Sequence, residues 1–415
     1  MNGERCSPSR AKGGAVLAAG VILAVVFGVA AWAQAPFETP PVFTAANLAP
    51  ADLLAGKGFT VDSQVPVEGF LERFTIRADV GLFEAHGRNL LPNRVGEVKA
   101  LQKLKAVGDT EEYLKAVGQA GARPILSAVN MLAHPVDTIT GLPSGVERMF
   151  GRLDLGAQHI WAAAHDPDQS GLEATGKTTA VVLGYEAERR KLAKELGVDP
   201  YTSNPELRHR LDDVAWVRFA GRLTVNLPLA ALAPASTVIS ATSWVNNVIY
   251  DTPMGDLIVL NEKKLQAMGV PESTIKAFMG NQWLTLSLKT SLVGALERIS
   301  GVPGRADVIA FASNAISEDQ ARFVVGAAEM LARYHETVGP ITMIQAPGPI
   351  VGQIGSGGIV IPAPVDYVAW TRRVAELSQR QDLRAVQRAV VLSGKMSPLA
   401  KKQFESGGWT VREGF

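Results

Sequence analysis

The sequence predicts an α+β protein that is mainly helical, and three patterns support this fold class. Residues 34–120 contain a stretch in which apolar residues alternate with a period near two, which is typical of strands. Apolar residues recur at steps of three and four through most of residues 121–336, as they do on the buried face of helices. Short apolar runs separated by glycines return in residues 337–415. We therefore expect an N-terminal antiparallel strand meander, a central helical body and a small C-terminal α/β unit.

Residues 1–33 have the layout of a signal peptide. Arg5, Arg10 and Lys12 precede an uncharged apolar run, and Ala31-Trp32-Ala33 has the small-x-small form of a cleavage site. The run is nearly long enough to cross a bilayer, so an uncleaved leader would be an N-terminal transmembrane anchor. In either case we expect the rest of the chain outside the cytoplasm, in the periplasm or secreted.

The composition is that of a globular protein, with 47% apolar and 20% charged residues. Loss of the leader would remove three basic residues and Glu4, which leaves 38 basic and 39 acidic residues of the original 41 and 40. This balance gives no strong positive field, so no nucleic-acid partner is expected. The single cysteine, Cys6, lies in the leader. The mature chain is therefore predicted to be disulfide-free and to depend on its core for stability.

The N-terminal part begins with a Pro- and Ala-rich lead-in, residues 34–58, that ends in a short helix. The strand-like stretch runs from Phe59 to Gly87, and glycines within it mark its turns. Two helices are predicted within residues 95–117. We interpret Glu84 and His86, at the end of the last strand, as surface residues rather than a catalytic pair.

A rigid helical hairpin is predicted over residues 184–223. The corner DPYTSNP holds two prolines, and Asn204 followed by Pro205 is a typical helix start. We interpret the polar residues of the corner as a self-bonded turn, and the hairpin as scaffold. Its charged residues are expected to surround the apolar stripes or to face solvent; they are Glu186, Arg189, Arg190, Lys191, Lys194, Glu206, Arg208, Arg210 and Asp212.

A long apolar face between residues 125 and 153 is the feature with the clearest functional implication. Its apolar residues keep a helical period, although two prolines and three glycines exclude one straight helix. Short helices sharing one face could lie on a membrane or wrap a hydrophobic ligand, whereas the structural alternative is a face packed against the core. The predicted ligand or membrane face comprises Val136, Ile139, Leu142, Val146, Met149 and Phe150.

The patterns in the rest of the chain predict helices and strands packed in the core. Residues 221–255 are apolar but too rich in polar residues and prolines for a membrane span. Residues 256–336 are helical, with a capping box at Ser317-Glu318-Asp319-Gln320. A hairpin, a helix over residues 365–378 and a final strand–helix–strand unit are predicted after Gly339.

Several motifs match a ligand-binding pattern without its context. GLEATGKT at residues 171–178 has the phosphate-loop spacing, but no buried strand precedes it. Residues 166–171 begin like a calcium loop, but Lys177 stands where a bidentate glutamate is required. The glycines of residues 352–358 precede a strand rather than the helix of a dinucleotide loop. We therefore expect no cofactor and no metal.

A hydrolase is the alternative function. Ser393 follows a predicted strand, where α/β sheets place ligands. His335 is the nearest histidine in the sequence, and Asp366 could orient it. The chain has no G-x-S-x-G elbow, so the triad rests on residue types alone.

Four segments together resemble a known group of proteins. HPVDTITGLPSGVERMFGR, GYEAERRKLAKELGVDPYTSN, ARYHE and LSGKMSPLAKKQFESGGWTV are similar, in the same order, to segments of a family of uncharacterised exported bacterial proteins. The similarity covers most of the chain after the leader. It implies one multi-part unit, and it implies no activity, ligand or catalytic residue.

These observations predict an extracytoplasmic envelope protein. Its leading function is that of a non-catalytic binding module for a hydrophobic ligand, a membrane surface or a protein partner of the envelope. The alternative is the hydrolase that would use Ser393 and His335.

Overall fold

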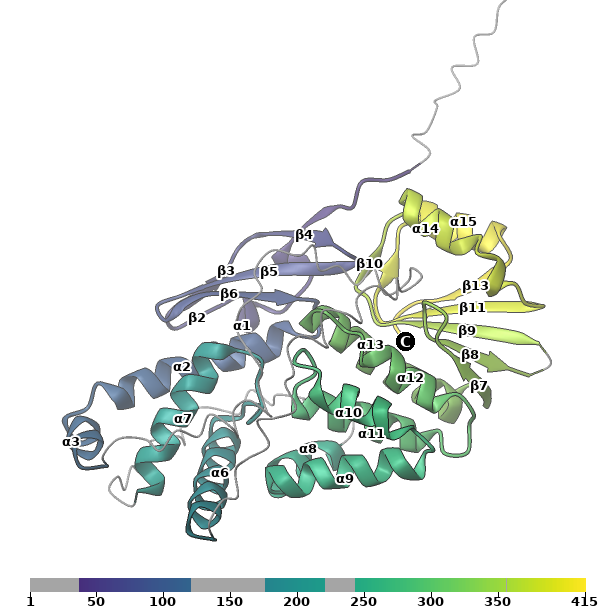
Figure 1. Ribbon diagram of the computed structural model, residues 1–415. Helices are drawn as coiled ribbons and strands as arrows, with labels where there is room; N and C mark the ends of the chain where they lie inside the picture. Colours follow the sequence, from purple (N-terminus) through teal and green to yellow (C-terminus); the bar gives the residue numbers. More distant parts are fainter. Residues whose placement is uncertain (1–36, 121–175, 221–242, 356) are drawn as a thin grey trace, which may run out of the picture. The chain divides into compact units, whose positions relative to one another are not determined.

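The N-terminal sheet is built by the alternating stretch that the sequence indicates. A computed structural model describes residues 37–120, 176–220, 243–355 and 357–415, and residues 37–415 belong to one compact unit (Figure 1). The first strands are β1 (Val42–Thr44), β2 (Ala55–Gly56), β3 (Phe59–Val61), β4 (Gln64–Glu68), β5 (Leu71–Ala78) and β6 (Gly81–His86), with α1 (Ala51–Leu54) between β1 and β2.

The antiparallel N-terminal sheet is confirmed, and its order is β1-β4-β5-β3-β2, with β6 on the other side of β5. A strict meander would pair β3 with β4. Here both pair with the long β5, at its two ends. Buried residues alternate along β5, as expected for a sheet with one covered face.

The helical body is also confirmed within the described residues. It consists of α6 (Gly176–Leu196), α7 (Pro205–Phe219), α8 (Ser243–Asp251), α9 (Met254–Ala267), α10 (Glu272–Gly280), α11 (Leu286–Arg298), α12 (Arg305–Ala312) and α13 (Glu318–Thr337). The two helices predicted for the N-terminal part precede it as α2 (Leu91–Gly108) and α3 (Glu111–Ala120). One apolar cluster joins α2, α6 and α7, and another joins α9 to α13 with the C-terminal sheet. No helix of the described ranges is both long and apolar enough to cross a membrane.

Helix ends follow the predicted chemistry. The Asn204 side chain accepts a hydrogen bond from the Leu207 N–H and caps α7, with Pro205 in the first turn. Ser317 caps α13 by accepting from the Gln320 N–H. The Gln320 side chain reaches back to the N–H of Ile316, one residue before the cap, so the predicted capping box is shifted by one residue.

The C-terminal unit contains β7 (Ile341–Gln345), β8 (Val351–Ile354), β9 (Gly358–Ala363), β10 (Tyr367–Val368), α14 (Arg372–Ser378), β11 (Gln387–Leu392), β12 (Lys395–Met396), α15 (Pro398–Ser406) and β13 (Trp409–Arg412). Its main sheet has the order β13-β11-β9-β8-β7. The predicted strand–helix–strand unit is confirmed, since β11 and β13 are parallel and α15 lies between them in sequence.

The helix predicted over residues 365–378 is wrong in its first half. Its first residues form β10, which pairs with β12, and the helix begins only at Arg372 after the cap of Thr371. The backbone N–H groups of Asp366 and Tyr367 donate to the carbonyl of Phe70, in the turn between β4 and β5. Partners so distant in sequence hold these two residues out of a helix.

Candidate functional site

The three residues of the hydrolase alternative have separate partners. Ser393 Oγ donates to the Val365 carbonyl at 2.9 Å. His335 Nδ1 accepts from the Ile341 N–H at 3.0 Å, where α13 leads into β7. Among the described residues, no hydrogen bond joins any two of Ser393, His335 and Asp366. The geometry therefore gives the serine no base.

Asp366 is an anchor rather than an orienting group. Its Oδ2 accepts from the backbone N–H groups of Glu72 at 2.9 Å and Arg88 at 3.1 Å. Burial raises the pKa of Asp366 to about 6, while these two N–H groups and the Arg88 guanidinium oppose that rise. Together with the two hydrogen bonds to Phe70, this carboxylate fixes β10 on the N-terminal sheet. Phe70 itself has a φ of 74°, which is strained for an aromatic residue.

The other predicted sites lie outside the described residues. This holds for the ligand or membrane face, Val136, Ile139, Leu142, Val146, Met149 and Phe150, and for the calcium-like motif and all but the end of the phosphate-loop motif. In the ranges that are described, no group of three or more His, Cys, Asp or Glu side chains is placed to hold a metal ion.

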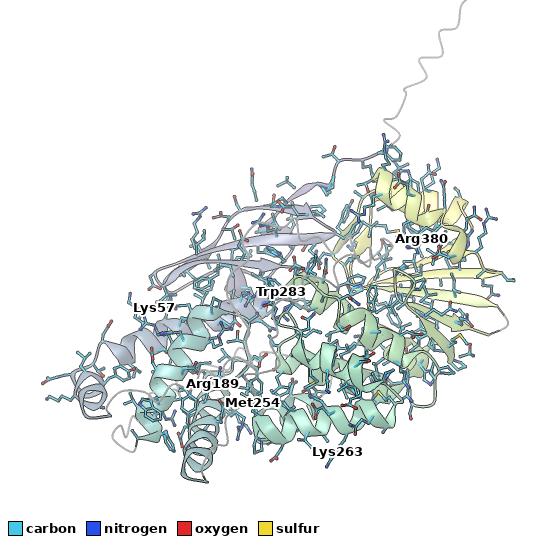
Figure 2. All side chains as sticks on the ribbon, viewed as in Figure 1. Lys57, Arg189, Met254, Lys263, Trp283 and Arg380 are labelled. Carbon is cyan, nitrogen blue, oxygen red and sulfur yellow. The ribbon has the colours of Figure 1, made fainter. Side chains whose placement is uncertain are left out.

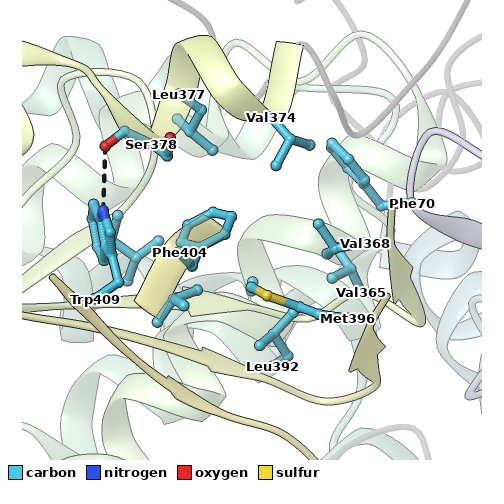
Figure 3. A pocket seen from close by; sticks show the side chains of 13 residues that line it. Phe70, Val365, Val368, Val374, Leu377, Ser378, Leu392, Met396, Phe404 and Trp409 are labelled. Atoms are coloured by element: carbon cyan, nitrogen blue, oxygen red, sulfur yellow. Dashed lines mark hydrogen bonds between the residues drawn. The ribbon is translucent and has the colours of Figure 1, made fainter. Parts of the chain in front are cut away.

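An apolar cavity lies in the C-terminal unit, between α14, α15 and the sheet (Figure 3). Its volume is about 30 Å³, and its lining includes Phe70, Met396, Phe404 and Trp409. The Trp409 indole N–H donates to the Ser378 carbonyl at 3.2 Å, so the polar edge of that ring is satisfied. A cavity that binds benzene measures about 150 Å³. The smaller cavity is therefore a packing void and not a site for a ligand of that size.

The α6–α7 hairpin holds a cluster of buried charges, although the sequence pattern predicts these residues at the surface. We define the buried charge cluster as Glu186, Arg189, Arg190 and Asp212. Their exposed fractions are 3%, 1%, 8% and 4%. Arg189 lies on α6 in the helical body (Figure 2). The expectation that Arg189 and Arg190 surround the apolar stripe and that Asp212 faces solvent is therefore wrong.

Arg189 and Asp212 form the paired half of this cluster. The Arg189 Nε lies 2.7 Å from Asp212 Oδ1, and the Tyr185 hydroxyl donates to the same oxygen at 2.6 Å. Burial alone would lower the pKa of Arg189, but the carboxylates of Asp212 and Glu186 raise it above its ordinary value. Burial and the charge of Asp212 raise the pKa of the Tyr185 hydroxyl. Arg189 is thus a fixed cation in the helical core.

The remaining half of the cluster is unpaired. Within the described ranges, neither carboxylate oxygen of Glu186 has a hydrogen-bond partner, and the same is true of Arg189 Nη2, Arg190 Nη1 and the Tyr201 hydroxyl. The Trp216 indole N–H is also buried and unpartnered. Buried polar atoms normally find partners, and each one without a partner costs about 1–3 kcal/mol. This concentration makes the buried charge cluster the candidate functional site among the described residues.

Three other buried side-chain atoms of the described residues lack a hydrogen-bond partner, Arg189 Nε, Ser291 Oγ and Arg305 Nε, although Arg189 Nε has its ion-pair contact with Asp212. Burial raises the pKa of Glu186, as does the charge of Asp212, while Arg189 and Arg190 oppose the rise. Burial also raises the pKa of Tyr201. A carboxyl group in this position is therefore easier to protonate than an exposed glutamate.

A neighbouring polar network shows what a satisfied cluster looks like in this chain. Glu97 on α2 accepts from the side chains of Arg94, Thr202 and Asn204. Arg94 also donates to Glu318 at 2.9 Å, and that carboxylate accepts from Ser203 as well. The predicted self-bonded corner is confirmed in part, since Asn204 N–H donates to Thr202 Oγ1. The corner also has a second role, as the link between α2 and α13.

An aromatic row adjoins the buried charge cluster. It consists of Tyr185, Trp216 and Phe219, whose successive ring centroids are 6.2 and 5.8 Å apart. Gly184 permits the close approach of α7, because a Cβ at this position would lie 2.4 Å from the Phe219 ring. Charged and apolar surfaces therefore meet where α6 crosses α7.

One signal in the sequence could have indicated this site. Arg189 falls four residues after Tyr185 and three before Leu192, so it lies on the apolar stripe itself. Asp212 falls three residues before Ala215 on the facing helix. Opposite charges on two facing stripes predict a buried pair.

The chain matches no protein-family model, no curated protein and no solved structure.

Proposed function

We propose that the protein is a non-catalytic binding protein that acts outside the cytoplasm and takes up a hydrophobic ligand at the α6–α7 hairpin. The observation that supports this proposal most strongly is the set of unpartnered polar atoms on four buried residues, Glu186, Arg189, Arg190 and Tyr201, beside the aromatic row. A ligand with a polar end and an apolar body would supply the missing partners and cover the rings.

Binding fits this geometry better than hydrolysis. Ser393 donates to the Val365 carbonyl and His335 accepts from the Ile341 N–H, so neither side chain is placed to activate the other. The charged residues of the hairpin are held by helices on a rigid corner, which is the kind of scaffold that orients a ligand precisely.

The test is direct detection of a ligand. The protein is purified from export-competent cells, denatured and extracted with organic solvent, and the extract is analysed by mass spectrometry. We expect one hydrophobic compound at a ratio near one per chain. Trp216→Leu should lower this ratio, whereas Trp283→Leu, a matched change of another half-buried tryptophan, should not. The proposal fails if no compound is retained and no fraction of a membrane extract raises the melting temperature.

A membrane surface is the second candidate partner, and the apolar pattern of residues 125–153 favours it. Flotation of the protein with liposomes at low and high salt tests this candidate. Flotation that persists at high salt and is lost in a Met149→Asp/Phe150→Asp variant would support apolar insertion. An envelope protein would become the better candidate if the chain stays with the soluble fraction yet co-purifies with one partner in a fixed ratio.

A further inference from the structure

We infer that the ligand of the hairpin carries a carboxylate, and that Glu186 takes up one proton when this carboxylate binds. The inference rests on the proposed function and specifies the chemistry of the ligand. It follows from a count of donors and acceptors and from the charge balance of the buried charge cluster.

Unpartnered donors outnumber unpartnered acceptors at the site. Arg189 Nη2, Arg190 Nη1 and the Trp216 indole N–H can only donate. The two oxygens of Glu186 are the only atoms that must accept, and the Tyr201 hydroxyl can do either. A ligand that completes this set has to bring acceptors. Among common acceptor groups, a planar carboxylate matches the fork of a guanidinium group.

The charge balance requires a proton as well. Arg189 and Arg190 offset Asp212 and Glu186 when all four are ionised, so a bound carboxylate would leave one negative charge in excess. An uncompensated buried charge is costly, and protonation of Glu186 removes it. Neutral Glu186 can then donate its O–H, as a buried carboxylic acid does when it binds an anion.

Other titratable groups around the cluster are already engaged. Asp212 on α7 bonds to Tyr185 and pairs with Arg189. On α8, Tyr250 donates to the Val198 carbonyl at 2.9 Å, and Asp251 pairs with Lys194. From the corner, Tyr201 faces the cluster with an unpartnered hydroxyl, and the Asp199 carboxylate is engaged by the Tyr201 N–H and the Ser287 hydroxyl. Glu186 is therefore the group that can accept the proton.

The apolar part of the ligand would lie along the aromatic row. Trp216 and Phe219 are half-buried, while the charged heads beside them are sealed from solvent. A ligand can reach those heads only when the helices separate locally. Binding should accordingly be slower than a diffusion-limited encounter.

The experiment uses 3-phenylpropanoate as the probe and 3-phenylpropanamide as its neutral isostere. Isothermal titration calorimetry near pH 7, in two buffers with different ionisation enthalpies, gives both the affinity and the number of protons taken up. We expect the carboxylate to bind with uptake of about one proton and the amide to bind at least roughly tenfold more weakly, because a charge-assisted hydrogen bond is lost. Glu186→Gln should bind the carboxylate without proton uptake. Arg190→Met should lose the preference for the carboxylate, and Arg384→Met, an exposed arginine elsewhere, should keep it.

Three other results would count against the role of Glu186, the carboxylate ligand or the proposed function. Binding of the carboxylate by the wild type without proton uptake overturns the role of Glu186. Equal affinity for acid and amide, unaffected by Arg190→Met, overturns the inference about the ligand but leaves the proposed function intact. If neither compound binds and no hydrophobic compound is extracted from the purified protein, the proposed function fails with it.

Discussion

Removal of the Asp212 carboxylate should be among the most damaging single changes in the hairpin. The Asp212→Ala variant leaves the Arg189 guanidinium, 1% exposed, without its ion-pair partner, and it leaves the Tyr185 hydroxyl without its acceptor. Breaking a buried ion pair from one side costs about 3–5 kcal/mol, and an orphaned buried hydroxyl adds about 1–3 kcal/mol. Because such terms overlap, we expect a loss of about 4 kcal/mol. That is a large share of the roughly 5–15 kcal/mol that stabilises a typical domain.

Urea denaturation followed by far-UV circular dichroism measures this loss as a shift of the midpoint at constant slope. The double variant Arg189→Met/Asp212→Leu removes both charges and should recover most of the stability, since apolar residues of similar volume replace buried pairs at little cost. Asp62→Ala is the matched control. Its partner Arg77 lies at a similar distance, 2.8 Å, but in a pair exposed to water, so only a small change is expected. A loss below about 1 kcal/mol for Asp212→Ala, or an equal loss in the double variant, would refute the burial argument.

Four further predictions concern other parts of the chain. His86 lies between two acceptors, Asp319 at 2.8 Å from Nδ1 and Glu84 at 3.3 Å from Nε2, so both ring nitrogens can donate only in the imidazolium form. The hydrogen bond to Asp319 raises the pKa of His86, although burial opposes this rise. The imidazolium therefore stabilises the folded state fully below the ordinary pKa of 6.5, and this stabilisation is lost as the pH rises through the raised pKa. His86→Gln should therefore flatten the pH dependence of the unfolding midpoint in this range, and an unchanged slope would contradict the imidazolium. Burial lowers the pKa of Lys289 to about 7. The free-energy cost of burying this lysine is therefore complete below pH 7 and disappears above its ordinary pKa of 10.5. Lys289→Met should therefore change the melting temperature more favourably near pH 6 than near pH 10, because the lost hydrogen bond to the Met279 carbonyl lowers stability at both pH values. An effect independent of pH would contradict the buried cation. Ser393→Ala should cost about 1 kcal/mol for one hydrogen bond and leave ligand retention unchanged; loss of a hydrolytic activity in this variant would revive the hydrolase. Gly394→Ala should prevent folding, because its Cβ would lie 1.9 Å from the Asp366 carbonyl oxygen, and a soluble variant with a native melting temperature would contradict this contact.

The sequence predicted what local chemistry determines. Strand alternation, the cap of α7 by Asn204 and the apolar stripes of the hairpin depend on residues close to one another in the chain, so their patterns are visible without a structure. The start of α14 was missed because Phe70, about 300 positions away, holds Asp366 and Tyr367 in another conformation.

The site was missed for a different reason. Arginine and aspartate are nearly always exposed, so their default placement is the surface. Arg189 and Asp212 can be buried only because each neutralises the other, and that pairing appears only when α6 is placed against α7. The cluster is a property of two facing stripes and not of either helix alone.

The corner between α6 and α7 links a satisfied polar network to an unsatisfied one. Thr202 and Asn204 donate to Glu97, and the Tyr201 N–H donates to Asp199, so the backbone of the corner is fixed by its own side chains and by α2. Only the Tyr201 hydroxyl is left without a partner, and it faces the buried charge cluster. Within the hairpin and its corner, the unpartnered atoms belong to Glu186, Arg189, Arg190, Tyr201 and Trp216, while the network around Glu97 has its partners. This contrast supports the proposal that a ligand completes the buried charge cluster.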